Sequence, residues 1–486
     1  MNIYRGLKGI SILIVLTLAA KSVLAQAESA STSESNETIR SENGVHRWKN
    51  STGLTNFNIE VRGKIEVTDD DKDIKSLSND GYLQITKTVF GSKRAVIIES
   101  LGGGKIKKEY YEGRTKMDWE PHGKNWLSEI LPEIVRSTTL AAEGRVNRIF
   151  AKEGTSGVLA ELAKLEGDYT RAHYAKLLLE KNIPSTEIAN VITKVADAIG
   201  SDYYLSTVFQ NNVTKMLSTP EAADAFFQGT KKINSAYYKS VVLKEALKKF
   251  PASPSQVKVI LQSAATIDSE YYLSVVLTTL LEQNDVKEES LNELIIVSKN
   301  IPSDYYRTQV LSKALEKQGI SKTVLKSMVD ALADVNSDYY KTSVFNSMAE
   351  HSAMDPDVQL QVINLIESSV SSDYYASSSL KDILEHQKLS DESFKQLVSV
   401  GGDLGSANYA REVLGKAAKK ELTKNQLIEI LKASGNIDSD YYLSEVLLDL
   451  ANQVRSSDSS VKDAYRQAAK RINSETYYGR AVKAID

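Results

Sequence analysis

The residues of this chain that could do chemistry give little support for catalysis. Among 486 residues there are five histidines and no cysteine. No two histidines share the spacing of a metal site, and the lack of cysteine excludes thiolate ligands, cysteine nucleophiles and disulfides. The sequence contains neither a Gly-x-Ser-x-Gly motif nor a phosphate-binding loop. We therefore expect a protein that is not an enzyme and that needs no metal or cofactor. The histidines are His46, His122, His173, His351 and His386.

Two short motifs resemble ligand-binding loops only in part. Asp69-Asp70-Asp71-Lys72-Asp73 is strongly acidic, but it lacks the glycine turn and the bidentate glutamate of a calcium loop. We interpret it as a solvated turn. Gly102-Gly103-Gly104 lacks the Lys-Ser/Thr ending of a phosphate loop and does not open a helix, so we expect a hairpin turn there.

Tyrosine is the unusual residue of this chain, with 24 copies against nine phenylalanines and three tryptophans. Most tyrosines stand in pairs that return about every 34 residues, and a serine precedes each pair. Three residues after that serine is a tyrosine in all nine copies, and two residues after it is a tyrosine in seven. We call these the second and the first tyrosine. The first tyrosines are the candidate binding residues: Tyr203, Tyr237, Tyr271, Tyr305, Tyr339, Tyr374 and Tyr441.

The residues around each pair indicate the start of a helix. Serine is a preferred N-cap, and Asp or Glu at the next position suits the positive end of the helix dipole. An apolar residue two places before the serine anchors the incoming chain. The nine serines are Ser201, Ser235, Ser269, Ser303, Ser337, Ser372, Ser406, Ser439 and Ser474.

The position of each tyrosine on this helix suggests its role. The second tyrosine lies near the border of the apolar stripe, so we expect it to pack within its repeat. The first lies well off that stripe, and it either stacks on the adjacent repeat or faces outward. A small Ser or Thr three residues after the first tyrosine, such as Ser206 or Thr308, leaves room for something to lie against the first ring.

A fixed period of this size is typical of a helical repeat array. Residues 289–299 have helical periodicity and represent the second helix of each unit. Residues 150–486 resemble the HEAT, armadillo and tetratricopeptide class of α-solenoids. The length matches tetratricopeptide repeats, but their Trp, Leu-Gly-x-x-Tyr and closing Pro pattern is not present. The resemblance implies a mainly α fold, a right-handed HEAT-like α–α superhelix of about ten two-helix repeats.

The N-terminal part has a different organisation. A basic, then apolar, then small-residue layout predicts a signal peptide over 1–25, and a polar segment without periodicity predicts a flexible linker over 26–50. Alternating apolar residues separated by glycines predict a small antiparallel β module over 51–120. The helical array is expected over 121–486.

This N-terminal part also resembles a known kind of module. The residues that carry the likeness are Asp73 to Leu77, Gly81-Tyr82-Leu83 and Trp126-Leu127. Similar modules occur in exported bacterial proteins of unknown function, and some accompany membrane zinc metallopeptidases of the β-lactam-sensor type. Peptidase activity is not implied, because the chain has no His-Glu-x-x-His motif.

Together these features predict a non-enzymatic scaffold in the periplasm or outside the cell. A formal charge of −3 gives no reason to expect nucleic acid or an anionic membrane as partner, and we expect no membrane span after signal cleavage. A protein or peptide partner is favoured because tyrosine is enriched in interface hot spots. The alternative is glycan or cell-wall binding by stacked tyrosines. A remote alternative is a hydrolase with carboxylates from separate repeats.

Overall fold

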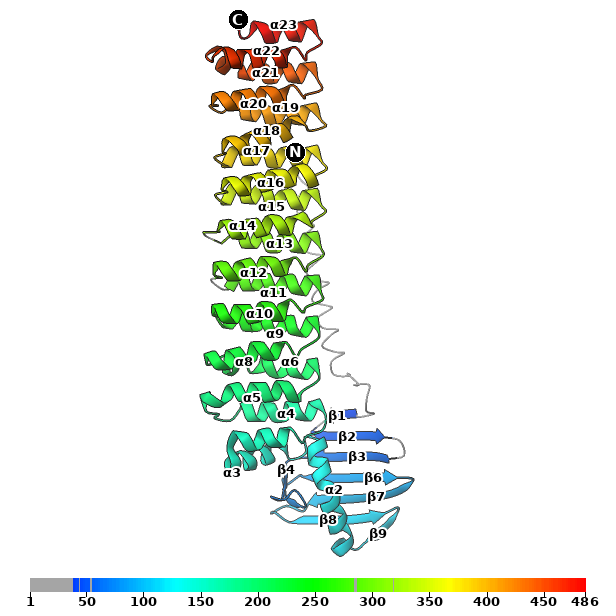
Figure 1. The fold of residues 1–486 in the computed structure, drawn as a ribbon. Helices are drawn as coiled ribbons and strands as arrows, with labels where there is room; N and C mark the ends of the chain where they lie inside the picture. The colour runs from blue at the N-terminus through cyan, green and yellow to red at the C-terminus, as the bar shows by residue number, and fades with distance from the viewer. Residues whose placement is uncertain (1–37, 43, 53–54, 284–285, 318) are drawn as a thin grey trace, which may run out of the picture. The chain divides into compact units, whose positions relative to one another are not determined.

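The computed structural model describes residues 38–486 except 43, 53–54, 284–285 and 318 (Figure 1). The expected signal peptide, and the expected linker as far as residue 37, lie outside the described residues. Two compact units divide the chain, with the boundary between Pro184 and Ser185. In the described part of the chain, no helix has both the length and the apolarity required to cross a membrane.

An antiparallel sheet of seven strands forms the base of the first unit, in the order β1-β2-β3-β6-β7-β8-β9. Two further strands, β4 and β5, make a separate ribbon. The three glycines at 102–104 turn the chain between β7 and β8 with positive φ angles, as expected. The strands are β1 (Thr38–Glu42), β2 (Val45–Thr52), β3 (Thr55–Arg62), β4 (Ile65–Val67), β5 (Ile74–Leu77), β6 (Tyr82–Val89), β7 (Ser92–Ser100), β8 (Ile106–Glu112) and β9 (Thr115–Met117).

The sheet begins earlier than the sequence indicated. Strands β1 and β2 lie in the segment expected to be a flexible linker, so the module starts at Thr38 and not at residue 51. Both strands are rich in polar residues, and Trp48 of β2 contributes to the core. Backbone pairing of β2 with β3 along its whole length holds a strand that has no hydrophobic alternation of its own.

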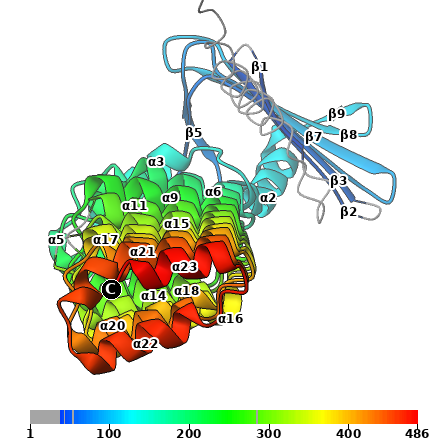
Figure 2. The same cartoon turned by 90° about the horizontal axis from the view of Figure 1, so that it is seen from above.

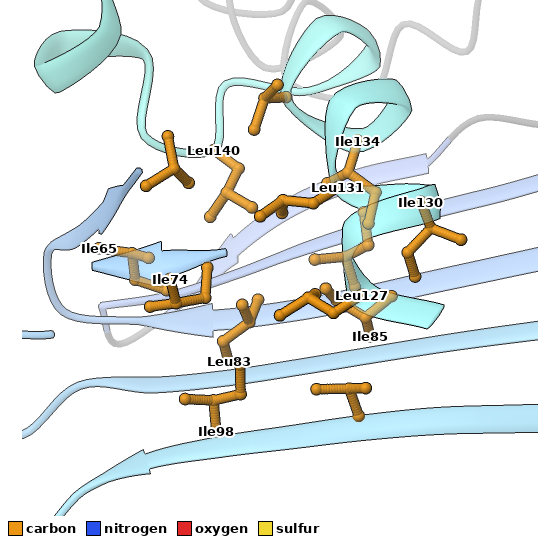
Figure 3. Close-up of a cluster of buried hydrophobic side chains, with 14 of the residues drawn as sticks. Ile65, Ile74, Leu83, Ile85, Ile98, Leu127, Ile130, Leu131, Ile134 and Leu140 are labelled. Atoms are coloured by element: carbon orange, nitrogen blue, oxygen red, sulfur yellow. The ribbon is translucent and has the colours of Figure 1, made fainter. Parts of the chain in front are cut away.

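The first helix after the sheet belongs to this module and not to the repeat array. Helix α2 (Lys124–Ser137), which follows the short η1 (Trp119–Gly123), lies across one face of the sheet (Figure 3). Its apolar stripe, including Leu127, Ile130 and Leu131, packs on Leu83 and Ile85. The β module therefore does not end at residue 120, because its sheet needs this helix to bury its inner face.

The acidic turn between β4 and β5 is not simply a solvated turn. The carboxylate of Asp71 accepts hydrogen bonds from Arg145 at 2.7 and 3.1 Å and from Arg148 at 2.7 Å. Arg145 is 1% exposed and also donates to Glu161 at 2.7 Å and to the hydroxyl of Tyr174. The turn therefore anchors the ribbon to α3 (Ala142–Leu162) and α4 (Asp168–Leu179).

The second unit is a stack of paired helices. We call the helices that carry the tyrosines A helices and the intervening ones B helices. The A helices are α6 (Asp202–Asn211), α9 (Ala236–Lys249), α11 (Glu270–Gln283), α13 (Asp304–Leu315), α15 (Asp338–His351), α17 (Asp373–His386), α19 (Ala407–Ala418), α21 (Asp440–Arg455) and α23 (Glu475–Lys483). The B helices are α5 (Ser185–Ala198), α8 (Pro220–Thr230), α10 (Pro254–Ala264), α12 (Glu288–Ser298), α14 (Lys322–Ala333), α16 (Pro356–Ser369), α18 (Asp391–Gly402), α20 (Lys424–Ser434) and α22 (Ser459–Ala469).

In this stack, A helices pack on A helices and B helices pack on B helices. Each A helix contacts the A helices before and after it, each B helix does the same, and the short α7 (Val213–Met216) follows α6. Figure 2 shows α9, α11, α15, α17, α21 and α23 in one layer and α14, α18, α20 and α22 in the other. The expected fold class, an α–α repeat array preceded by a small antiparallel sheet, is confirmed.

The buried charge cluster of the first unit should give stability that depends on pH. Burial by itself raises the pKa of Glu161, but hydrogen bonds and charge from Arg145 and Arg136 outweigh it, so that the pKa lies below 4.5. Arg145→Met leaves two carboxylates without their main partner, and we expect a loss of about 3–5 kcal/mol at pH 7. The Glu161 part of this loss should be complete above its unfolded pKa and should fade as the pH falls through its folded pKa.

Tryptophan fluorescence reports unfolding of the first unit alone. The three tryptophans of the chain, Trp48, Trp119 and Trp126, all lie in that unit. Urea unfolding of the wild type and of Arg145→Met at pH 7 and pH 3 gives the comparison. An equal difference in stability at both pH values would show that the carboxylates do not depend on Arg145.

Candidate binding edge: the tyrosine ladder

The serine caps place the tyrosine pairs in the first turn of each A helix. The hydroxyl oxygen of Ser235, for example, accepts from the backbone N–H of Tyr238 at 3.5 Å. Six of the nine serines make this bond, which confirms the capping prediction for Ser201, Ser235, Ser269, Ser303, Ser337 and Ser439. Ser372, Ser406 and Ser474 make no side-chain cap bond.

The aspartate after the serine does more than complement the helix dipole. The carboxylate of Asp202 accepts backbone N–H groups from the next repeat, Asn234 at 2.9 Å and Ser235 at 2.6 Å. Asp304 accepts the corresponding groups of Asn336 at 3.1 Å and Ser337 at 2.8 Å. Each of these residues, which we call clamp aspartates, ties one A helix to the start of the next. The clamp aspartates are Asp202, Asp304, Asp338, Asp373 and Asp440.

The sequence changes on both sides of the contact where the clamp aspartate is missing. With a clamp, the residue before the next serine is Asn, Ser or Gly. Without one, that residue is Asp or Pro. Neither residue suits a clamp, because an aspartate there would repel the clamp carboxylate and a proline has no N–H to donate. A comparison of adjacent repeats therefore contained a signal for this contact that our sequence analysis missed. The three departures pair Ala236 with Asp268, Ala407 with Asp438 and Glu270 with Pro302.

The tyrosine rings form a zigzag along the array, in two continuous runs. Each first ring makes an edge-to-face contact with the second ring of its own pair, at 5.1 Å between centroids. It makes another with the second ring of the next repeat, at 5.6–6.2 Å. The two roles that the sequence left open for the first tyrosine are therefore combined. We call the rings from Tyr204 to Tyr409, and those from Tyr442 to Tyr477, the tyrosine ladder.

The first tyrosines of the ladder remain accessible. Tyr271 and Tyr305 are each 47% exposed, and the second rings beside them are half-buried. Within the described part of the chain, the hydroxyls of the seven first tyrosines have no hydrogen-bond partner in the protein. Burial is the main cause that raises the pKa of the Tyr238 and Tyr272 hydroxyls above the usual tyrosine value, and neighbouring tyrosines add to it. Both hydroxyls therefore stay protonated.

The small residue after the first tyrosine does not make room for a ligand. Ser206 and Thr308 are buried, and their hydroxyls donate to the carbonyl oxygens of Tyr203 at 2.9 Å and Tyr305 at 3.2 Å. What lies against the first ring is the second ring of the next repeat, as Tyr238 does against Tyr203. Ser206 and Thr308 themselves turn inward on the helix, and their hydroxyls bond to nearby backbone carbonyls, as serine and threonine commonly do in helices.

Three buried basic side chains directly follow a second tyrosine, and no local sequence pattern marked them as buried. Arg307 donates to the carbonyl oxygens of Lys299 at 3.1 Å, Ile301 at 3.0 Å and Ala331 at 3.2 Å, at the ends of α12 and α14. Lys341 donates to the carbonyl oxygen of Ser369, the last residue of α16. Lys239 donates to the hydroxyl of Thr266, just after α10. A cation at this end of a helix satisfies free carbonyls and complements the dipole.

The ladder is interrupted at one repeat. Asn408 takes the place of a first tyrosine, and its amide donates to Glu412 at 3.3 Å. Tyr409 contacts Tyr374, but no described ring links it to Tyr442. The last repeat confirms the register given by the serines, because Tyr441 contacts Tyr477 as its second tyrosine, at 5.8 Å.

Comparisons with known proteins add little to this description. No protein-family model and no curated protein matches the chain. Among solved structures, it is similar to a circular tandem repeat protein with novel repeat topology and enhanced subunit contact surfaces, at 10% identity and a TM-score of 0.18, covering 75% of this chain and 78% of that one. It is also similar to a structure from the computational design of self-assembling cyclic protein homo-oligomers, at 11% identity and a TM-score of 0.11, covering 71% and 97%. At such TM-scores the architecture rests on the helix pairs described above.

Removal of a clamp should loosen one inter-repeat loop without unfolding the array. Asp304→Ala takes away the acceptor of two amides, and a charge-assisted bond of this kind contributes about 1.5–3 kcal/mol. We expect hydrogen exchange at Asn336 and Ser337 to become at least about tenfold faster. Glu270→Ala is the matched control, because the Glu270 carboxylate holds no backbone amide in the described residues. Unchanged exchange at Asn336 in Asp304→Ala would contradict the clamp.

A tyrosine at the interruption should stabilise the array. Asn408→Tyr places a ring where it meets Tyr409 and Tyr442, and each edge-to-face pair contributes about 0.5–1.5 kcal/mol. We expect a higher midpoint of urea unfolding, followed by far-ultraviolet circular dichroism. Asn408→Ala, which loses only the bond to Glu412, is the comparison. The ladder would have no stabilising role if the two variants unfolded at the same urea concentration.

Proposed function

We propose that this protein is a non-enzymatic scaffold that binds a protein or peptide along the tyrosine ladder. The observation that carries this proposal is a row of half-exposed first tyrosines whose hydroxyls have no partner within the described chain. Ring contacts on two sides hold each side chain in place before any ligand arrives, so that binding loses little side-chain entropy. Tyrosine is also one of the residues that contribute most to binding energy in protein interfaces.

The ring geometry favours a protein or peptide over a glycan. A sugar stacks on the face of an aromatic ring, whereas each first ring is contacted by a second ring on either side along the array. The parts that stay accessible include the hydroxyl end of each first ring, which has no partner within the described chain. These parts suit hydrogen bonds to a polypeptide backbone and edge contacts with its side chains.

The location and the wider relationships belong to the same proposal. A basic, apolar and then small-residue layout in residues 1–25 supports export to the periplasm or the cell exterior. A HEAT-like relationship for the array is supported by a helical repeat of this length that lacks the tetratricopeptide pattern. An exported type of N-terminal module is supported by the motifs at 73–77, 81–83 and 126–127. The lack of cysteine is compatible with an oxidising compartment.

Capture experiments test this function. The full chain is used as bait in a periplasmic extract and, separately, with isolated peptidoglycan. Tyr237→Ala/Tyr271→Ala/Tyr305→Ala should lose the partner of the wild type, with a loss of at least about 2 kcal/mol because several hot-spot side chains are truncated. The control Ile296→Ala/Tyr478→Ala removes two exposed apolar side chains outside the ladder and should retain the partner.

The outcomes separate the proposals. Ladder-dependent capture of a protein supports the scaffold, and ladder-dependent sedimentation with peptidoglycan supports a glycan instead. If the ladder variant, shown to be folded by circular dichroism, behaves as the wild type in both assays, the ladder is structural only. Tyr→Phe at the same three positions replaces Tyr→Ala should the alanine variant unfold, because it preserves the rings and removes the hydroxyls.

A further inference from the structure

The ladder presents a regular series of notches. Tyr238 lies between Tyr203, at 5.9 Å, and Tyr237, at 5.1 Å, and the same arrangement returns in each following repeat. The outer rings are the exposed first tyrosines and the middle ring is the half-buried second one. We call this arrangement, a half-buried second ring flanked by two exposed first rings, a notch, and one notch occurs per repeat.

The period of these notches limits the conformation of a ligand. Successive first rings lie at most about 11 Å apart, since the two connecting steps for Tyr203 and Tyr237 measure 5.9 and 5.1 Å. Adjacent packed helices are spaced by about 8–10 Å. A polyproline II helix advances about 9.3 Å in one turn of three residues. A β-strand repeats its side-chain face every ~6.7 Å and does not match this spacing. Two turns of an α-helix advance about 10.8 Å, but the carbonyl oxygens of an α-helix already accept hydrogen bonds within the helix.

The chemistry of the ladder matches the same ligand. A polyproline II segment has no internal hydrogen bonds, so its carbonyl oxygens need outside donors. The hydroxyls of the first tyrosines have no partner within the described chain and can donate to them. Proline rings fit between aromatic side chains, which is how aromatic-lined grooves recognise proline-rich segments. The clamp aspartates are occupied by backbone amides, so these carboxylates do not add a demand for a basic ligand.

We infer that the ladder binds a proline-rich segment in the polyproline II conformation, with one turn of the ligand per repeat. This inference rests on the proposed function and narrows its partner class. The interruption at Asn408 sets the longest continuous tract, which runs from Tyr203 to Tyr374 and contains six first tyrosines. Five turns, or about 15 ligand residues, span that tract.

Fluorescence anisotropy with synthetic peptides tests the inference on the full chain. The probes are a labelled (Pro-Pro-Ala)6 peptide of about 18 residues, long enough for the tract, and (Gly-Ser-Ala)6, which is equally long and uncharged but flexible. We expect the proline peptide to bind at least about tenfold more tightly. Tyr237→Phe/Tyr271→Phe/Tyr305→Phe keeps the ladder rings and removes three hydroxyls, and should weaken binding by at least about tenfold. Tyr478→Phe, at an exposed tyrosine outside the ladder, is the matched control and should leave affinity unchanged.

Two results overturn the inference: equal binding of the two peptides, or wild-type affinity in the triple Tyr→Phe variant. Either failure is distinct from failure of the proposed function. Ladder-dependent capture of a protein together with no preference for the proline peptide removes the ligand class and leaves the scaffold in place. Absence of ladder dependence in both assays removes both.

Discussion

The most specific contact between successive repeats is the one between a clamp aspartate and the backbone amides of the following repeat, which five A helices make. Packed apolar faces hold helices together but allow them to slide and rotate by small amounts. A carboxylate that accepts two backbone N–H groups, as Asp202 and Asp304 do, permits much less displacement. Because the acceptor is at the start of one A helix and the donors are at the start of the next, the clamps fix the spacing of helix N-termini. The ring contacts keep nearly the same geometry where a clamp is absent, as between Tyr237 and Tyr272 at 5.6 Å and between Tyr271 and Tyr306 at 5.7 Å, so the packing of the A helices holds the rings there.

Much of the architecture followed from the sequence, because the features concerned are local. Serine caps, the apolar residue before each cap and the 34-residue period describe single repeats, and the structure agrees with most of them. The contacts between repeats were not predictable in the same way. The angle of a tyrosine on its own helix does not determine how the neighbouring helix is placed, and both roles considered for the first tyrosine proved to be compatible. The pairing of clamp aspartates with small polar residues one repeat later was present in the sequence, but it appears only when adjacent repeats are aligned.

The N-terminal unit shows a second limit, which is distance along the chain. Asp71 looked like part of a solvated turn because its partners Arg145 and Arg148 lie more than 70 residues away. Strands β1 and β2 were missed because inter-strand hydrogen bonds, and not an apolar pattern, hold them in the sheet. Helix α2 was predicted as a helix, yet its assignment to the array was a matter of tertiary packing. Local patterns identify elements, and only the fold shows which core each element completes.

The interruption at Asn408 shows that the edge and the core of the array follow separate constraints. Around this position the core continues without a gap, since Val413 and Leu414 of α19 are buried and α19 packs on α17 and α21. At the edge, the ring and the clamp aspartate are both replaced, by Asn408 and Ala407. A ladder required for stability alone would have no evident reason to stop where the core continues. Under the proposed function, the interruption divides the edge into a long and a short tract, and a ligand that spans several repeats would lie on one tract, since it needs a continuous series of notches.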